Sequence, residues 1–278
     1  MSNPYWTFIQ NVVAKVIASS HKTPSKNLSK NLFMTFELYH KYDKVESVMM
    51  FPDYVFDDIK EMQALWIPDS QTDASDLAGF ADLVLGNGVS YISMPCAATC
   101  EMWPWIEKNN IKIFNRFIFA NDKDIIDAVS ALATSVTAAF KSGAFGAQVF
   151  VTVKNIGAFC DAMKPVRQDL FFDKNFSVAI DVDEMRGQSW DKIFDALREI
   201  YPDAILITAH GDLFDADSGF VGVVFDMLNN WNLGSDLHVW VGKNTLRVSQ
   251  VLRLCQKIKP DLVQHMRIFT NAGPRVSE

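Results

Sequence analysis

The 278-residue sequence lacks several features that would place it in a specialised class of protein. It has no run of about 18 apolar residues, so we expect no helix that spans a membrane. Its N-terminus lacks a basic region followed by an apolar core and a small-residue cleavage site, so we expect no signal peptide. The four cysteines, Cys96, Cys100, Cys160 and Cys255, are too sparse for the disulfide framework of a secreted protein. Together these absences predict a reduced, cytoplasmic protein.

Positive charge and the common sequence motifs are also scarce. The net charge is -7, so we expect no broad basic face of the kind that binds a nucleic-acid backbone. A few local donors could still hold one small anion. The patterns GxGxxG, GxxxxGK[ST], HExxH and GxSxG are missing, which removes support for nucleotide-binding, zinc-protease and hydrolase interpretations. The predicted partner is therefore a small anionic metabolite, with no nucleic acid and no membrane, and a homodimer is left open.

The chain does contain a repeat of roughly 30 residues, the size of one βα unit. Apolar, β-branched runs predict strands at 89–94, 111–119, 147–153, 176–182, 204–208, 237–241 and 266–270. Helical spacing predicts helices at 101–108, 123–141, 156–170, 190–200, 219–230 and 246–258. These strands are apolar on both faces, as in a parallel sheet that is covered by helices.

An eighth strand is needed to close such a sheet into a barrel, and two segments, 32–38 and 45–51, are candidates for it. Residues 55–66 look helical. Eight parallel strands with crossover helices predict an α/β fold, a (β/α)8 TIM-type barrel. The structural alternative is an open, doubly wound sheet.

The two ends of the chain fall outside this repeat. Residues 5–19 have helical apolar spacing, so 1–30 is predicted to be an N-terminal helix and connector. We expect no helix after the last strand, and we expect the N-terminal helix to pack near the gap that this leaves. The whole chain, 1–278, is predicted to form a single barrel domain.

Polar residues follow the predicted strands at the end where barrels carry their active sites. Asp181 and Asp183 close the fifth strand, and strand alternation would put them on one face. They could act as a general base or as metal ligands, or they could cap the next helix. His210 follows the sixth strand as a candidate acid or base. Asp212 joins Asp181 and Asp183 as a metal ligand only if the protein depends on a metal.

Positively charged residues and glycines stand at other strand ends. Lys154, after the fourth strand, is a candidate electrostatic stabiliser, or a Schiff-base lysine if it is desolvated. An anion site is predicted after the last two strands, from Gly242, Lys243, Asn271, Gly273 and Arg275. The alternative for the lysines is that they form salt bridges to nearby carboxylates.

The third predicted strand carries two adjacent polar residues, Asn115 and Arg116. Neighbouring side chains on a strand point to opposite faces, so at most one of the two faces the inside of the barrel.

From about Gly146 to Val276 the sequence resembles the orotidine 5'-phosphate decarboxylase superfamily of ribulose-phosphate-binding barrels. The similar segments are GAQVFVTV, FSVAIDVD, ILITAHGD, LHVWVGKN and RIFTNAGPR. The resemblance implies a catalytic role for the region of His210 and a phosphate site at the last two strand ends. The family's Asp-x-Lys-x-x-Asp signature is not reproduced, because FIFANDKDIID places Asp122 directly before Lys123. The enediolate chemistry that depends on that signature is therefore not supported.

Three functional hypotheses follow. The first is a lyase or isomerase that acts on a small phosphorylated, sugar-like metabolite through an enolate-type intermediate, with no cofactor. The second is a divalent-metal aldolase or hydrolase that uses Mg²⁺. The third is a non-catalytic barrel that binds a ligand or a protein, with Trp103, Trp105 and Trp231 at an interface.

Overall fold

The computed structural model describes only part of the chain. The described residues are 63–67, 77, 79, 81, 84, 89–119, 124–171, 173–185, 188–208, 217–240, 242 and 245–270. The chain divides into two units, Met1–Phe56 and Asp57–Glu278, and every described residue belongs to the second unit. The predicted N-terminal helix and connector, and the residues after the last strand, lie outside this part. The single-domain organisation therefore stays a prediction.

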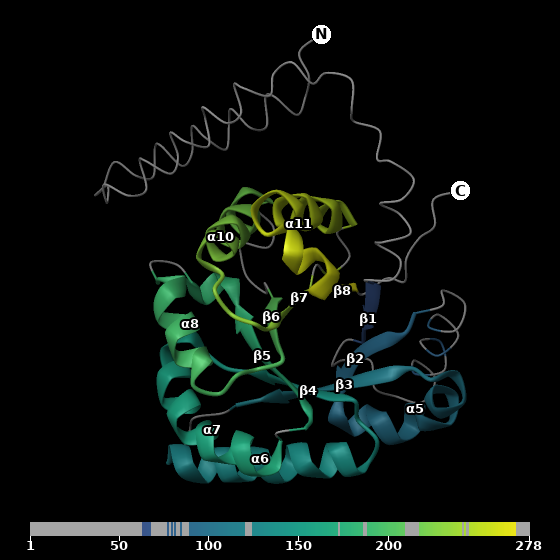
Figure 1. Ribbon diagram of the computed structural model, residues 1–278. Helices are drawn as coiled ribbons and strands as arrows, with labels where there is room; N and C mark the ends of the chain where they lie inside the picture. Colours follow the sequence, from purple (N-terminus) through teal and green to yellow (C-terminus); the bar gives the residue numbers. More distant parts are fainter. Residues whose placement is uncertain are drawn as a thin grey trace, which may run out of the picture. The chain divides into compact units, whose positions relative to one another are not determined.

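Eight parallel strands form a closed barrel in which each strand pairs with its neighbours in sequence order (Figure 1). The strands are β1 Gln63–Trp66, β2 Tyr91–Pro95, β3 Lys112–Ile118, β4 Gly146–Phe150, β5 Asn175–Asp181, β6 Ala204–Thr208, β7 Asp236–Trp240 and β8 Met266–Thr270. The barrel closes where β1 pairs with β8, with Ala64 opposite Phe269. The predicted (β/α)8 barrel is thus confirmed, and the open sheet is excluded.

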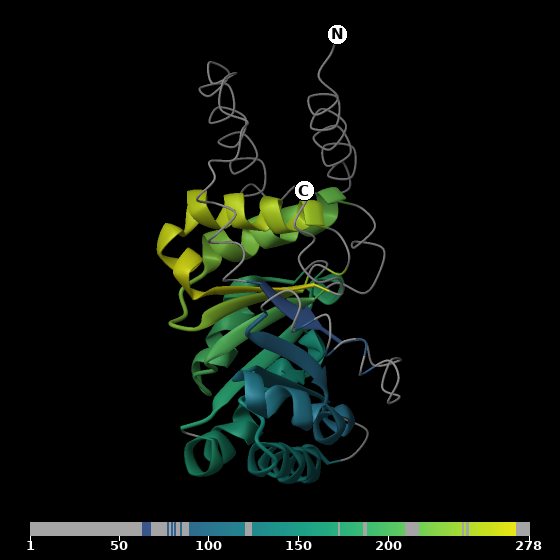
Figure 2. The ribbon, with the colours of Figure 1, turned by 90° about the vertical axis from the view of Figure 1, so that its right-hand side faces the viewer.

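Helices lie around the outside of this barrel (Figures 1 and 2). They are α5 Thr99–Ile106, α6 Ile125–Lys141, α7 Ile156–Leu170, α8 Trp190–Arg198, α10 Asp217–Asn230 and α11 Thr245–Ile258. Short 3-10 turns are η1 Cys96–Ala98, η2 Glu107–Asn109, η3 Val153–Asn155, η4 Val182–Met185 and η5 Pro260–His265. The six helices predicted between the strands from 89 onward, and the seven strands predicted there, are confirmed to within a few residues. Within the described part of the chain, no helix has the length and apolarity to cross a bilayer.

Helix α6 shows how local sequence defines these elements. The Asp124 side chain caps its first turn by accepting a hydrogen bond of 2.9 Å from the Ile126 backbone N–H. Just after the helix, Gly143 has a φ of 97°, a left-handed conformation that favours glycine. The helix buries one apolar stripe: Val129, Leu132, Ala133, Val136 and Ala139.

The prediction for the first strand was wrong. The strand beside β2 and β8 is β1, Gln63–Trp66, and neither 32–38 nor 45–51 takes that place. Because residues 63–66 form this strand, the helix expected at 55–66 cannot extend to residue 66. With four residues, QALW is too short to show a β-branched run. Pairing with two neighbours, rather than local propensity, makes it a strand.

The inside of the barrel is packed mainly with aromatic and aliphatic side chains. Strand alternation turns Ala64, Trp66, Phe114, Ala179, Leu206 and Phe269 inward, where they form one buried cluster. Gly146 makes room for this cluster, because a Cβ atom there would lie 2.5 Å from the ring of Phe114. The lumen is therefore a filled core, and polar residues inside it need a physical explanation.

Candidate active site

A band of polar side chains crosses this apolar lumen on four neighbouring strands. Ser93 lies on β2, Arg116 on β3, Gln148 on β4 and Ser177 on β5. Ser93, Gln148 and Ser177 are fully buried, and Arg116 is 7% exposed. The sheet register places Arg116 beside Gln148 and Gln148 beside Ser177, so the side chains share one face. We call these four residues the polar band.

Hydrogen bonds fix the Arg116 guanidinium toward the C-terminal end of the barrel. The Ser93 hydroxyl donates to Gln148 Oε1 at 2.6 Å and accepts from Arg116 Nη1 at 3.1 Å. Arg116 Nη2 donates to the carbonyl of Ile67, which directly follows β1. The guanidinium carbon also lies 4.0 Å from the centroid of the Trp66 ring. A positive charge is therefore held rigidly at the mouth where barrels bind their substrates.

Asn115 points the other way, as strand alternation predicts. Its Nδ2 donates to the hydroxyl of Thr99 in α5 at 2.5 Å, on the helix side of the sheet. The prediction that only one of Asn115 and Arg116 faces the lumen is confirmed, and the inward residue is the arginine.

On Gln148 and Ser177, the polar band contains buried atoms that have no hydrogen-bond partner among the described residues. They are Gln148 Nε2, a donor, and the hydroxyl of Ser177. Buried polar groups are costly to leave unpaired, so such atoms point to a bound water or ligand. With Arg116 alongside, the band can donate hydrogen bonds to an oxygen-bearing anion.

Asp181 closes β5 at the same end of the barrel and is half-buried. The strand ends there, and Asp183 lies in η4, so the two carboxylates do not share a strand face as predicted. Instead the Asp183 backbone N–H donates to Asp181 Oδ1 at 2.9 Å. This contact fixes the Asp181 carboxylate at the rim, which is the capping role that the sequence left open.

Two further predicted residues are described. Lys154 lies in η3, after β4, and is exposed. The turn that contains Lys154 is hydrogen-bonded to the turn after β5, because the Val153 backbone N–H donates to Glu184 Oε2 at 2.6 Å. Gly242 is buried beyond β7 with a φ of 60°, a conformation that favours glycine. The structure thus places Asp181 at the end of its strand, and Asp183, Lys154 and Gly242 just beyond theirs.

The other predicted site residues lie outside the described residues: His210, Asp212, Lys243, Asn271, Gly273 and Arg275. Their roles stay predictions. Within the part of the chain that is described, no three side chains of the metal-binding types gather into a metal site.

The interface prediction for the tryptophans is wrong in one case. Trp231 is 6% exposed, and its indole N–H donates to the carbonyl of Leu233 at 3.1 Å. Trp103 is partly buried and packs against the core, whereas Trp105 is 36% exposed. Trp231 is therefore a core residue and is not available to a partner protein.

Ser93, Gln148 and Ser177 were missed by the sequence interpretation, and Arg116 was noticed without a role. The signal was present, because Arg116 and Gln148 each interrupt an apolar strand, in IFNRFIF and GAQVFV. A polar residue in a strand that is covered on both faces must be paired or functional. These residues lie within their strands, whereas the sequence pattern predicts a site at the strand ends.

Comparison with known proteins adds evidence on the fold. No model of a protein family matches the sequence, and no curated protein is detectably similar to it. Solved structures do match. A Toxoplasma gondii protein designated a deoxyribose-phosphate aldolase shares 9% identity, with a TM-score of 0.59 over 78% of this chain and 90% of that one.

Two other structures with the same designation match as well. The deoxyribose-phosphate aldolase of Aeropyrum pernix, a tetramer, shares 14% identity with a TM-score of 0.56, over 79% of this chain and 89% of that one. A Coccidioides immitis protein shares 10% identity with a TM-score of 0.57, over 90% of this chain and 95% of that one. At such identities the likeness concerns the fold alone, and these proteins are not named as orotidine 5'-phosphate decarboxylases. The chain is therefore a (β/α)8 barrel similar in fold to these aldolases.

Proposed function

We propose that the protein is a lyase that cleaves a carbon–carbon bond in a small, phosphorylated, sugar-like metabolite through an enolate-type intermediate. The observation that carries this proposal is the buried Arg116 guanidinium, held by Ser93 with the unpaired Gln148 Nε2 in the same band. A fixed positive charge in a dry site stabilises an oxyanion that forms during reaction. The fold likeness to proteins designated aldolases agrees with this reaction class by analogy.

The proposed step is an aldol-type cleavage. A base takes the proton of the substrate hydroxyl, the neighbouring carbon–carbon bond breaks, and its electron pair forms an enolate on the carbonyl fragment. Arg116 and Gln148 Nε2 donate hydrogen bonds to the enolate oxygen, and an acid then protonates the enolate carbon. Asp181 is the proposed base, fixed by the Asp183 backbone N–H, and His210 is the proposed acid.

The phosphate of the substrate has its own proposed partners. Gly242, Lys243, Asn271, Gly273 and Arg275 follow the last two strands, where barrels commonly bind phosphate. Lys154 contributes positive charge from the loop after β4. If these residues bind the phosphate, as proposed, the unphosphorylated sugar should be a poor substrate.

Lysine positions support an enolate rather than a Schiff base. The eight strands are all described, and the only lysine on them is Lys112, the first residue of β3 at the opposite end. A Schiff-base mechanism would depend on a loop lysine such as Lys154 or Lys243. Borohydride trapping with substrate, followed by mass spectrometry, separates these mechanisms, and we expect no covalent adduct.

The test is a product screen over aldose and ketose phosphates and their unphosphorylated forms. We expect cleavage of a phosphorylated substrate, with kcat lowered about 10²–10³-fold by Arg116→Gln. The control is Arg198→Gln, which removes an exposed arginine paired with Asp195. The proposal fails if no sugar is cleaved or if Arg116→Gln matches the wild type. Activity that is lost on EDTA treatment would instead support the metal-dependent alternative with Asp181, Asp183 and Asp212.

A further inference from the structure

The opposite end of the barrel, where the strands begin, carries a second group of charged and aromatic side chains. Tyr91 and Lys112 are the first residues of β2 and β3, and Arg267 is the second residue of β8. Lys112 Nζ donates to the Tyr91 hydroxyl oxygen at 3.2 Å, and Arg267 Nη2 donates to the same oxygen at 3.1 Å. Two cations therefore meet at one neutral side chain.

Aromatic rings surround these two cations. Lys112 Nζ lies 5.1 Å from the Tyr91 ring centroid and 4.8 Å from that of Phe145, and the Arg267 guanidinium carbon lies 4.2 Å from that of Tyr91. In the part of the chain that is described, neither Lys112 nor Arg267 forms a salt bridge with a carboxylate. Two half-buried positive charges side by side repel each other, so an anion between them would be favourable.

The carboxylates at this end of the barrel have other partners. Asp236 lies 3.2 Å from His265, and Asp203 lies 2.7 Å from Arg167. A further acid of the cavity wall, Asp173, lies 3.1 Å from Lys174 on the surface. The charge of Arg267 also acts on Asp236, where it partly offsets the rise in carboxyl pKa that burial causes. Among the described side chains, Lys112 and Arg267 therefore lack a carboxylate in direct salt-bridge contact, and Arg267 has only this longer-range attraction.

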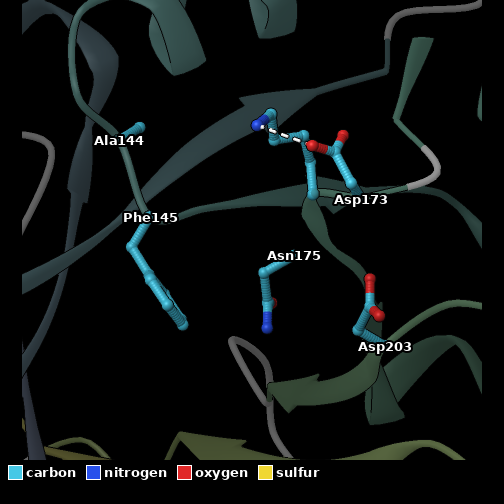
Figure 3. Close-up of a pocket in the computed structure, with 6 residues that line it drawn as sticks. Ala144, Phe145, Asp173, Asn175 and Asp203 are labelled. Carbon is cyan, nitrogen blue, oxygen red and sulfur yellow. Dashed lines mark hydrogen bonds and ion pairs between the residues drawn. The ribbon is translucent and has the colours of Figure 1, made fainter.

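A cavity of about 490 Å³ opens at the same end, and Figure 3 shows the residues around it. Its lining consists of Ala144, Phe145, Asp173, Lys174, Asn175 and Asp203. Phe145 is common to the cavity and to the cation pair, because its ring contacts Lys112. Small-molecule sites commonly have volumes of roughly 300–1,000 Å³, so this cavity has the size for a metabolite.

The cavity also contains an unpaired hydrogen-bond acceptor. Asn175 Oδ1 is buried and has no donor among the described residues. Asp173 and Asp203 add further acceptor oxygens to the wall. This wall suits a molecule that carries hydroxyl or amino donors, whereas the neighbouring cations suit an acidic group.

We propose that the N-terminal mouth of the barrel is a second ligand site, which binds a small molecule with an acidic group, phosphate or carboxylate, and several hydroxyl or amino donors. The acidic group binds Lys112 and Arg267, the donors face Asn175 Oδ1, and Phe145 lies between the two ends. This site is at the opposite end of the strands from the proposed active site at the C-terminal mouth, and it does not depend on the function proposed there.

The state of Tyr91 supports this arrangement. Burial raises the pKa of the Tyr91 phenol, but the hydrogen bond from Lys112 and the charges of Arg267 and Lys112 outweigh it, so the pKa lies below its usual value of 10.0. A bound anion would compete for the same two cations, and it should therefore raise the Tyr91 pKa.

Calorimetric titration with ribose 5-phosphate and with inorganic phosphate tests the proposal, with ribose as the uncharged comparison. We expect both anions to bind, ribose 5-phosphate more tightly, and ribose not to bind. Lys112→Gln and Arg267→Gln should each weaken binding about tenfold. Lys192→Gln removes an exposed lysine on α8 and should change nothing, and Arg116→Gln should leave this site intact.

A second measurement needs no charge-removing variant and so does not depend on their folding. The Tyr91 titration is read from tyrosinate absorbance as the difference between the wild type and Tyr91→Phe. Phosphate should raise the midpoint of that difference curve, whereas chloride at equal ionic strength should not. The proposal is overturned if phosphate leaves the curve unchanged, or if Lys112→Gln and Arg267→Gln bind like the wild type.

Discussion

The guanidinium carbon of Arg116 lies 4.0 Å from the ring centroid of Trp66, inside a barrel where both side chains are less than a tenth exposed. Trp66 is itself held by Trp240 and Phe150, whose rings lie 5.4 Å and 6.1 Å away. A cation over an indole ring that is shielded from water contributes about 2 kcal/mol. The stacking and the hydrogen bond to Ser93 together keep the charge in one position, as electrostatic catalysis requires.

Arg116→Lys should destabilise the protein although it keeps the charge. Lysine lacks the planar fork that reaches both Ser93 and the Ile67 carbonyl, and it stacks less well on Trp66. We expect a loss of about 1–3 kcal/mol in the free energy of unfolding, measured by urea denaturation. Arg198→Lys, at an exposed surface pair, should stay within about 0.5 kcal/mol of the wild type. Equal effects of the two changes would contradict this role of Arg116.

Gly146→Ala should also destabilise the barrel, for a steric reason. A Cβ atom at this position would lie 2.5 Å from Phe114, whose ring is fixed by Phe269 and His238. We expect a loss of about 1–3 kcal/mol in the free energy of unfolding, because an overpacked core must shift. Gly157→Ala is the matched control, since nothing lies within 4 Å of its Cβ position in α7. It should be neutral or stabilising by up to about 1 kcal/mol in the same denaturation series.

Sequence patterns predicted most of the fold because its elements obey local rules. Strands β2 to β8 are apolar runs, and α7 begins and ends at the predicted residues, Ile156 and Leu170. The prediction of β1 failed because its four residues, QALW, show no hydrophobic periodicity and no β-branched side chain. Only pairing with β2 and β8 identifies it, and that pairing depends on residues more than 20 positions away in the sequence.

The site was harder to predict than the fold, because it depends on distances across the barrel. The rule that ligands bind beyond the C-terminal strand ends drew attention to Asp181, which does lie at the end of β5. The contact between Ser93 and Gln148, which are 55 residues apart, has no local signature. The change from strand to 3-10 turn after Asp181 also removed the alternation that would have put Asp183 on the same face.

Acid should destabilise the wild-type protein more steeply than His238→Leu. Burial first, and then the Arg267 charge, lowers the pKa of His238 from 6.5 to about 3. Below pH 6.5 the His238 imidazole binds a proton in the unfolded chain but stays neutral in the folded chain. The free energy of unfolding therefore falls as the pH drops toward about 3. The slope from this one group reaches about 1.4 kcal/mol per pH unit.

Urea denaturation of both proteins across that pH range measures the effect. The cavity that leucine leaves costs the same at every pH, so the difference between the two curves isolates the histidine. A difference that does not change with pH would show that His238 is protonated inside the folded barrel.

Lys112→Met should raise the pKa of Tyr91. Lys112 supplies a hydrogen bond and a positive charge that favour the phenolate, whereas methionine keeps a similar apolar stem and removes both. Tyrosinate absorbance, followed against pH in each protein and in its Tyr91→Phe partner, isolates the titration of this one residue. Lys192→Met, on the surface of α8, should leave the midpoint where it is in the wild type. If Lys112→Met also leaves the midpoint unchanged, Arg267 alone lowers the pKa of Tyr91. Only one of the two cations would then act strongly on a ligand at the N-terminal mouth.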